Sequence, residues 1–262
     1  MLRVMTFNVR GFYHAQDGAN AWDSREALNL RTIRRCAADL IGFQEVQGGN
    51  LRVYHRELTD YHYVAWPENG NQPPHEWPAI YWRPDVLRPL ESGGFWLSET
   101  PEVWSASWDT DCIRSATWVR FEHRASGRPV LHLNTHLDHV SEQARVEGTR
   151  LILQRLRMLV DGGVAIVTAD FNAAPDSATH RLFIDDGFAD AHVAAGNSAA
   201  PLDSFTYHGF EGPAFRGSDA APRRIDWVLI RGAAVRSCEI VRDGEPPLWP
   251  SDHFPVVAEL SL

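Results

Sequence analysis

The feature that most constrains the fold is a repeated pattern, in which short apolar runs with strand-like composition alternate with helical stretches. We expect strands at residues 2–8, 40–46, 61–66, 78–82, 116–121, 129–135, 164–168, 224–230 and 255–260. We expect helices from 24 to 38, around 51–58, and from about 141 to 160. Some strands follow one another through turns, which is typical of an α+β fold with largely antiparallel pairing.

The 262 residues contain no repeat, low-complexity tract or linker, so we expect a single domain over residues 1–262. A composition of 44% hydrophobic and 23% charged residues is that of a globular protein able to bury a full core. No apolar run approaches the ~18 residues of a membrane span. The three cysteines, Cys36, Cys112 and Cys238, share no close spacing. With no signal peptide evident, they predict a reducing, cytoplasmic location and no cysteine metal knuckle.

The charge pattern excludes several chemistries. All 25 basic residues are arginine, so Schiff-base, pyridoxal phosphate and P-loop lysine chemistry are absent. The net charge of −9 argues against a protein that tracks long duplex nucleic acid. It does not argue against a small phosphorylated substrate that is reached through a metal ion.

Polar clusters end or follow the apolar runs. They are Thr6-Phe7-Asn8, Gln44-Glu45, Asn134 to His139, Thr168 to Asn172, Arg224-Ile225-Asp226 and Ser251-Asp252-His253. Strand ends in layered folds hold catalytic groups on a rigid scaffold that still meets solvent. We therefore expect the functional site to be assembled from these segments.

The side chains in these clusters suit one kind of chemistry. Five of them offer oxygen ligands, which suit Mg²⁺ or Mn²⁺ better than Zn²⁺: Asn8, Glu45, Asp170, Asn172 and Asp252. Two histidines, His136 and His253, can carry protons near neutral pH. A hard cation with carboxylates and histidines can direct water at a phosphate ester.

Taken singly, most of these positions also have a structural explanation. Asn8 could form a strand-end hydrogen bond, and His136 could be a satisfied core histidine. Asp170 and Asn172 could form an Asx-turn. Asp226 could pair with Arg224 or Arg223, and residues 251–255 could be an ordinary turn. Glu45 follows a buried strand, where an unpaired carboxylate is costly.

In this order along the whole chain, the clusters resemble the endonuclease/exonuclease/phosphatase superfamily, which has the deoxyribonuclease I-like fold. The most specific segments are Asp170-Phe171-Asn172 and the Ser-Asp-His-x-Pro stretch that begins at Ser251. Residues 94–101 are similar to a compact, single-domain bacterial branch. The resemblance implies a four-layer sandwich of two packed mixed, largely antiparallel sheets flanked by helices, with one metal-dependent site at a shared edge.

The resemblance also implies roles for the metal and water side of the site. Glu45 resembles the principal metal ligand, with Asn8 and Asp252 near the same cation. Asp170 resembles the group that orients or deprotonates the attacking water. The cofactor implied is Mg²⁺ or Mn²⁺.

On the phosphate side, Asn172 is expected to hold a phosphate oxygen. His253, oriented by Asp226, and His136 are expected to flank the scissile phosphate as acids or charge stabilisers. Which histidine protonates the leaving oxygen stays open.

Two further positions follow less directly. Arg114 precedes the strand expected at 116–121, where relatives place a phosphate-contacting arginine, although it could be a surface arginine. Asp138 and His139 are expected to line the substrate pocket or surround the metal, although a solvated loop before the third helix explains them too. Segments 20–25 and 69–77 are candidate pocket walls, and the arginines at 31, 34 and 35 are expected to be solvated.

The sequence thus predicts a metal-dependent phosphoesterase. Its expected substrate is a phosphodiester or phosphomonoester of a sugar, inositol, lipid headgroup or nucleotide, attacked directly by activated water. One alternative is a single-strand nuclease or deadenylase-like exonuclease, with a groove of arginines and stacked aromatics. Another is a non-catalytic binding module, against which the presence of Glu45, Asp170 and His253 argues. A carboxylic ester hydrolase is disfavoured because the chain has neither Gly-x-Ser-x-Gly nor His-Glu-x-x-His.

Overall fold

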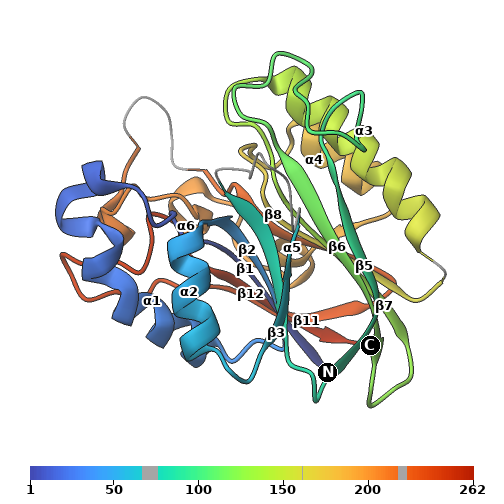
Figure 1. Cartoon of the computed structure of the whole chain (residues 1–262), viewed down its shortest axis with the longest axis horizontal. Coiled ribbons are helices and arrows are strands. Elements are labelled where there is room, and N and C mark those ends of the chain that lie inside the picture. Colours follow the sequence, from blue (N-terminus) through green and yellow to red (C-terminus); the bar gives the residue numbers. More distant parts are fainter. Residues whose placement is uncertain (67–75, 161, 218–222) are drawn as a thin grey trace.

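Two sheets packed face to face form the centre of the molecule (Figure 1). The computed structural model describes residues 1–66, 76–160, 162–217 and 223–262. Within them the first sheet has the order β11(Ala234–Ile240), β12(Val256–Ser261), β1(Leu2–Asn8), β2(Leu40–Val46), β4(Trp77–Trp82), β3(His62–Ala65). The second has the order β5(Leu87–Trp96), β6(Ser115–His123), β7(Pro129–His136), β8(Val164–Asp170), β10(Asp226–Arg231), β9(Ala189–Asp190).

The strand pairing is largely antiparallel, as the sequence predicts. The pairs β1–β2 and β7–β8 are parallel, and the other pairs are antiparallel. Because the parallel pairs run the same way, Asn8 lies beside Gln44 and His136 lies beside Asp170. The polar strand ends of each sheet therefore meet at one edge, opposite the two chain termini in Figure 1.

Helices cover the outer faces of both sheets and complete four layers (Figure 1). The helices are α1(Trp22–Cys36), α2(Gly48–Glu57), α3(Glu142–Leu159), α4(Ala178–Asp185), α5(Ala191–Ala194) and α6(Pro201–Ser204), with short 3-10 turns at Ala15–Asn20 and Gly212–Ala214. Ser141 caps α3, since its hydroxyl accepts the backbone N–H of Ala144. The helix α1 begins at Trp22, two residues earlier than the sequence predicts. None of the described helices is long and apolar enough to cross a membrane.

The alternation of side chains along the strands builds three apolar layers. Val4 and Ile80 face the second sheet and pack in the central layer with Phe121. Met5, the neighbour of Val4, points the other way and packs beneath α1 and α2. On the far side, Leu153 of α3 belongs to the layer that covers the second sheet.

A buried polar network also joins the two sheets, and it uses several residues of the strand-end clusters. Gln44 donates to Thr6 Oγ1 at 3.0 Å and to Asn134 Oδ1 at 2.7 Å. Thr168 donates to the same oxygen of Asn134 at 3.0 Å. All four side chains are fully buried, so these hydrogen bonds fix the position of one sheet on the other.

Candidate active site

A pocket of about 360 Å³ opens at the edge where the two parallel strand pairs end. Seven of the predicted site residues line it: Glu45, Arg114, His136, Asp170, Asn172, Asp252 and His253. His139 lines it as well. Two more predicted residues, Asn8 and Asp226, are completely buried behind these side chains. The fold therefore brings together segments that lie more than two hundred residues apart.

Asp170, the last residue of β8, lies at the centre of this arrangement. Its Oδ2 accepts the side-chain N–H of Asn8 at 3.0 Å. The same oxygen lies 3.4 Å from Nε2 of His136 and 3.8 Å from Nε2 of His253. A carboxylate of only 2% exposure is thus flanked by two imidazoles, one on each side.

Asn8 holds carboxylates in place instead of facing the pocket. Its side-chain nitrogen donates to Glu45 Oε1 at 2.9 Å and to Asp170, while its Oδ1 accepts the backbone N–H of Arg10 at 3.0 Å. The side chain therefore supports Glu45 and Asp170 from behind, and the expectation that Asn8 lies near the cation stays a prediction.

The position of Glu45 depends on an irregularity of β2. The register with β4 shifts between Phe43 and Val46, and Glu45 has a φ of 59° in the left-handed region. A β-bulge re-aims a side chain that would otherwise follow the alternation of the strand. Arg10 and Asn172 also line the pocket with positive φ, at 49° and 47°. Such strain in non-glycine residues concentrates at functional sites.

His253 and Asp226 form the buried pair that the resemblance implies. Nδ1 of His253 lies 2.9 Å from Asp226 Oδ2, and both residues are at least 96% buried. Although burial opposes the charged imidazole, Asp226, Asp170 and Asp252 together raise the pKa of His253 to about 10. Asp226 therefore does not pair with Arg224, which binds Asp190 instead at 2.8 Å and 3.1 Å.

His136 is held by three neighbours. Its Nδ1 lies 2.9 Å from both Arg114 Nη1 and Glu76 Oε1, and its Nε2 lies 3.0 Å from Asn172 Nδ2. Arg114 and Glu76 also form an ion pair. Although burial opposes ionisation of Glu76, Arg114 and His136 lower its pKa to about 2. Glu76 belongs to the segment 69–77 that the sequence offered as a candidate pocket wall, but it was given no role of its own, because it precedes its strand instead of ending one.

Asp170 and Asn172 also form the Asx-turn that the sequence allows. The backbone N–H of Asn172 donates to Asp170 Oδ1 at 2.9 Å, and Asn172 Nδ2 donates to the carbonyl of Leu137 at 3.0 Å. The turn leaves Oδ2 of Asp170 to Asn8 and the histidines. The structural and functional explanations of this motif are therefore compatible.

Asp138 is expected to line the substrate pocket or surround the metal, but it is not among the described residues that line the pocket. Its Oδ2 accepts from Thr110 Oγ1 and from the backbone N–H groups of Asp111 and Cys112, at 2.9–3.1 Å. Its Oδ1 accepts the backbone N–H groups of Val140 and Ser141. With both oxygens occupied, and despite partial burial, hydrogen bonding lowers the pKa of Asp138 to about 2. The carboxylate ties two loops together.

The donor set fits a hard divalent cation. Glu45, Asp252 and Asp170 bring carboxylate oxygens to one pocket, and oxygen ligands are those that Mg²⁺ and Mn²⁺ prefer. Ligand atoms of Glu45, Glu76 and His136 lie within 4.8 Å of one another, as do those of Asp170, Asp226 and His253. Glu45 keeps 14% of its side chain exposed, so it can still take a ligand from the pocket.

The two segments expected to form walls of the pocket, 20–25 and 69–77, have different outcomes. Trp22 and Arg25 of the segment 20–25 are buried, and Arg25 donates to the backbone carbonyls of Val9 and Pro250 at 2.7 and 3.0 Å. This segment therefore supports the loops on either side of the site and does not form a wall. Most of the segment 69–77 lies outside the described residues. The aromatic wall that the described residues do provide is Tyr207, whose ring packs against His253.

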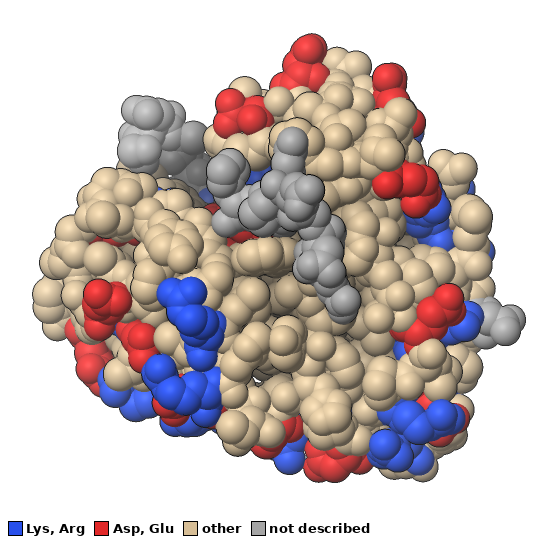
Figure 2. All heavy atoms as spheres, viewed as in Figure 1, with Lys and Arg blue, Asp and Glu red and all other residues tan. Residues whose placement is uncertain are grey.

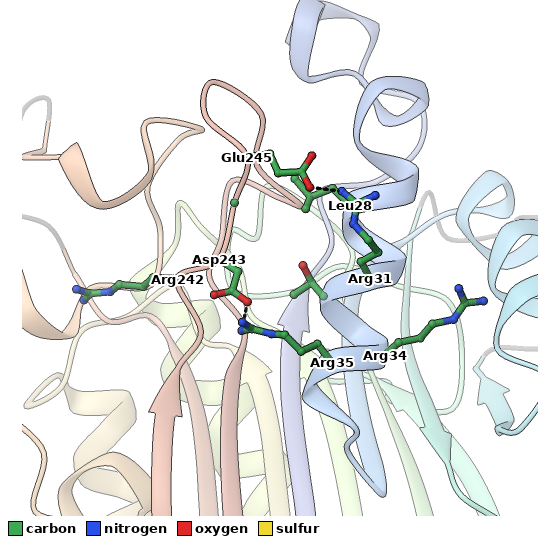
Figure 3. Close-up of a pocket in the computed structure, with 9 residues that line it drawn as sticks. Leu28, Arg31, Arg34, Arg35, Arg242, Asp243 and Glu245 are labelled. Atoms are coloured by element: carbon green, nitrogen blue, oxygen red, sulfur yellow. Dashed lines mark hydrogen bonds and ion pairs between the residues drawn. The ribbon is translucent and has the colours of Figure 1, made fainter.

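A second, larger cavity of about 650 Å³ lies between α1 and residues 242–245 (Figure 3). We call it the arginine pocket; it is lined by Leu28, Arg31, Thr32, Arg34, Arg35, Arg242, Asp243, Gly244 and Glu245. Arg31 pairs with Glu245 and Arg35 pairs with Asp243, whereas Arg34 points away from both carboxylates (Figure 3). Arg34 instead pairs with Glu57 of α2. Arg31, Arg34 and Arg35 are more than half exposed, as the sequence predicts.

Fold and site together define a deoxyribonuclease I-like protein, and the comparisons agree. The model of the Endonuclease/Exonuclease/phosphatase family matches residues 5–253, so the chain belongs to this family. Family members are generally hydrolases that depend on divalent metal. No curated protein matches the sequence.

Among solved structures, a family member from Bacteroides vulgatus is 30% identical, with a TM-score of 0.89 over 100% of this chain and 98% of that one. A mannosyl-6-phosphatase from Bacteroides thetaiotaomicron is 27% identical, with a TM-score of 0.89 over all of both chains. TDP2 from D. rerio, complexed with a single-strand DNA product, shares the fold at 16% identity, with a TM-score of 0.78 over 100% and 99% of the chains.

Proposed function

We propose that this chain is a phosphoesterase that hydrolyses a small phosphorylated substrate with water, using Mg²⁺ or Mn²⁺. The observation that carries the proposal is the Asp170 carboxylate between two imidazoles, 3.4 Å from His136 and 3.8 Å from His253. A carboxylate that can accept the proton of water, beside imidazoles that can protonate the leaving oxygen, supplies the base and the acid for hydrolysis of a phosphate ester.

In the reaction, Asp170 orients the attacking water and accepts its proton as the oxygen–phosphorus bond forms. Asn8 fixes Asp170 Oδ2 by its hydrogen bond, so the carboxylate does not need to reorganise during the step. The bond to the leaving oxygen breaks, and that oxygen takes a proton from His136 or His253. A monoester gives inorganic phosphate and an alcohol, and a diester gives a phosphate monoester and an alcohol.

The charge that develops on the phosphate is met by fixed groups. Arg114 and Asn172 both contact His136, so all three present their polar atoms to the same part of the pocket. His253 carries a positive charge at neutral pH, because its pKa is raised to about 10 by the surrounding carboxylates despite its burial. Fixed positive groups in a buried pocket stabilise the transition state more than mobile ones in water.

Glu45 and Asp252 are the residues that would hold the cation. When bound, a divalent cation supplies a positive charge that neutralises a phosphate oxygen and polarises the phosphorus. Asp252 is kept in place by Ser251, whose hydroxyl donates to the carbonyl of Asn8 at 2.7 Å and lies 3.2 Å from Asp252 Oδ1.

The size of the pocket favours a small substrate. A volume of about 360 Å³ is near the lower end of ligand pockets, which span roughly 300–1,000 Å³. The full-length similarity to a mannosyl-6-phosphatase favours a phosphorylated sugar and hydrolysis of a monoester.

A nuclease is supported less well. Both arginines of the pocket pair with carboxylates, and on the face in Figure 2 arginines lie in separate groups beside acidic residues.

The test compares hydrolysis of mannose 6-phosphate, p-nitrophenyl phosphate and bis(p-nitrophenyl) phosphate with Mg²⁺, Mn²⁺ or EDTA. We expect metal-dependent turnover that Asp170→Asn abolishes. The matched control is Asp243→Asn, which removes a carboxylate of the arginine pocket. Faster turnover of the diester than of both monoesters would reject the monoester assignment. Absence of turnover on these substrates and on short oligonucleotides would reject the phosphoesterase itself.

A further inference from the structure

A group of metal-binding side chains lies at the rim of the pocket, outside the machinery described above. It consists of Asp111 and Cys112, from the loop before β6, and His139, from the loop after β7. Asp111 Oδ2 lies 3.7 Å from His139 Nε2 and 3.6 Å from Cys112 Sγ. One ligand atom from each of the three residues lies within 4.8 Å of the other two.

These separations are close to those of a tetrahedral metal site. Zinc binds nitrogen and oxygen at about 2.0–2.2 Å and sulfur at about 2.3 Å, so an oxygen–sulfur edge of the tetrahedron is about 3.5–3.7 Å and an oxygen–nitrogen edge about 3.3–3.6 Å. The distance of 3.6 Å between Asp111 and Cys112 falls within the first range, and the distance of 3.7 Å between Asp111 and His139 is slightly longer than the second. The third pair, Cys112 and His139, lies within 4.8 Å.

The loops that carry these residues are held together by Asp138. One of its oxygens binds the backbone N–H groups of Asp111 and Cys112, and the other binds those of Val140 and Ser141. Because Asp138 directly precedes His139, this single carboxylate sets the distance between the two halves of the group. Arg145 adds a hydrogen bond to the Asp138 carbonyl at 2.8 Å. A site supported in this way requires little reorganisation on binding.

We propose that Asp111, Cys112 and His139 bind one zinc ion, separate from the oxygen-rich cation site around Glu45. A thiolate, an imidazole and a single carboxylate suit zinc, whereas Mg²⁺ requires oxygen ligands. Cys112 gives up its thiol proton to solvent on binding. Three protein ligands leave a fourth position for water or for an oxygen of the substrate. The ion would border the substrate, because His139 lines the same pocket.

The side chains are accessible to an ion from solvent. Asp111 and His139 are about half exposed, at 56% and 49%, and Cys112 is partly exposed. The other two cysteines, Cys36 and Cys238, are buried in the apolar core. A metal–thiolate signal from the folded protein therefore reports on Cys112.

The test is a titration of the metal-free, full-length protein with Co²⁺ in the presence of excess Mg²⁺, which occupies the oxygen site. We expect one equivalent of Co²⁺ to give a thiolate-to-metal charge-transfer band that stoichiometric Zn²⁺ abolishes. Cys112→Ser should remove the band, and His139→Gln should weaken binding about tenfold or more. Circular dichroism verifies that both variants are folded.

Asp109→Asn is the matched control for Asp111→Asn, because Asp109 is an exposed carboxylate of the same loop. Asp111→Asn should weaken Co²⁺ binding, and Asp109→Asn should leave it unchanged. A band that persists in Cys112→Ser, or the absence of a band in the unsubstituted protein, would overturn the proposal. Equal weakening by the two asparagine variants would show that only loop charge matters, and would overturn it as well.

Discussion

The candidate active site and the arginine pocket differ in the burial of their charged groups, and the difference shows what volume alone does not indicate about a cavity. The arginine pocket is the larger, at about 650 Å³ against 360 Å³, and it is lined by four arginines. Its ion pairs join side chains that are largely exposed, such as Arg31 and Glu245. In the candidate active site, Asp170 and His253 are nearly inaccessible to solvent, and so is Asp226 behind them.

Burial strengthens the interaction between charged groups and shifts their pKa values. Water screens exposed pairs, so a surface ion pair contributes only about 0–1 kcal/mol. In a buried site, charges interact more strongly, and their pKa values shift. The raised pKa of His253 and the lowered pKa of Glu76 are examples. Perturbed groups in a cleft are a stronger sign of function than the volume of a cavity.

The largest expected effect is that of Asp170→Asn. An amide cannot accept the proton of the attacking water, so we expect kcat to fall by about 10³-fold, within the range for lost general-base catalysis. Steady-state kinetics measure it. Asp243→Asn in the arginine pocket should leave kcat unchanged, and a comparable loss in both variants would remove the distinction between the pockets.

Glu45→Gln should weaken the binding of the divalent cation and lower the activity together. An amide is a poorer ligand than a carboxylate for a hard cation, so we expect Mg²⁺ affinity to fall by about 10–100-fold. Calorimetric titration of Mg²⁺ and the Mg²⁺ dependence of turnover check this result. Unchanged affinity would show that Glu45 is not a ligand.

Asp226→Asn should lower kcat by about 10–100-fold, and His253→Ala should lower it more. Asp226 acts through the imidazole that it orients, and supporting groups of this kind have effects of that size. KM should change less than kcat in Asp226→Asn, because binding groups such as Arg114 remain. Wild-type turnover in Asp226→Asn would refute the orienting role.

The smallest expected effect is that of Arg35→Gln in the arginine pocket. Its ion pair with Asp243 joins exposed side chains, so we expect a loss of about 0.2–1 kcal/mol in the free energy of unfolding and no change in kcat. Urea denaturation and the same kinetic assay measure both. A clear fall in activity would mean that the arginine pocket takes part in function.

How well the sequence predicts a strand depends on how many of the residues in that strand are buried and apolar. The central strands were predicted because their apolar runs are continuous. β5 was not, since most of its middle residues are exposed and interrupt any apolar pattern. Among the polar residues, Thr6, Gln44 and Asn134 were grouped with the site, but they join the two sheets in the core.

The same reasoning explains which site residues could be found. Residues that end strands, such as Asp170, were identified by their position after an apolar run. Glu76 precedes β4, which runs antiparallel to β2, so the start of β4 lies at the same edge as the end of β2. Arg114 precedes β6 in the same way and was found only through the family resemblance. Antiparallel sheets therefore supply site residues from the starts of strands as well as from their ends.

The position of β1 between β12 and β2 has a consequence for the timing of synthesis. Asn8 and Glu45 leave the ribosome early, but the first strand lacks its antiparallel partner until β12 emerges, when Leu2 can pair with Leu260. Asp252 and His253 directly precede β12 and arrive with it. A nascent chain that ends before β12 is therefore expected to be inert, and the site should become complete only after β12 has been synthesised.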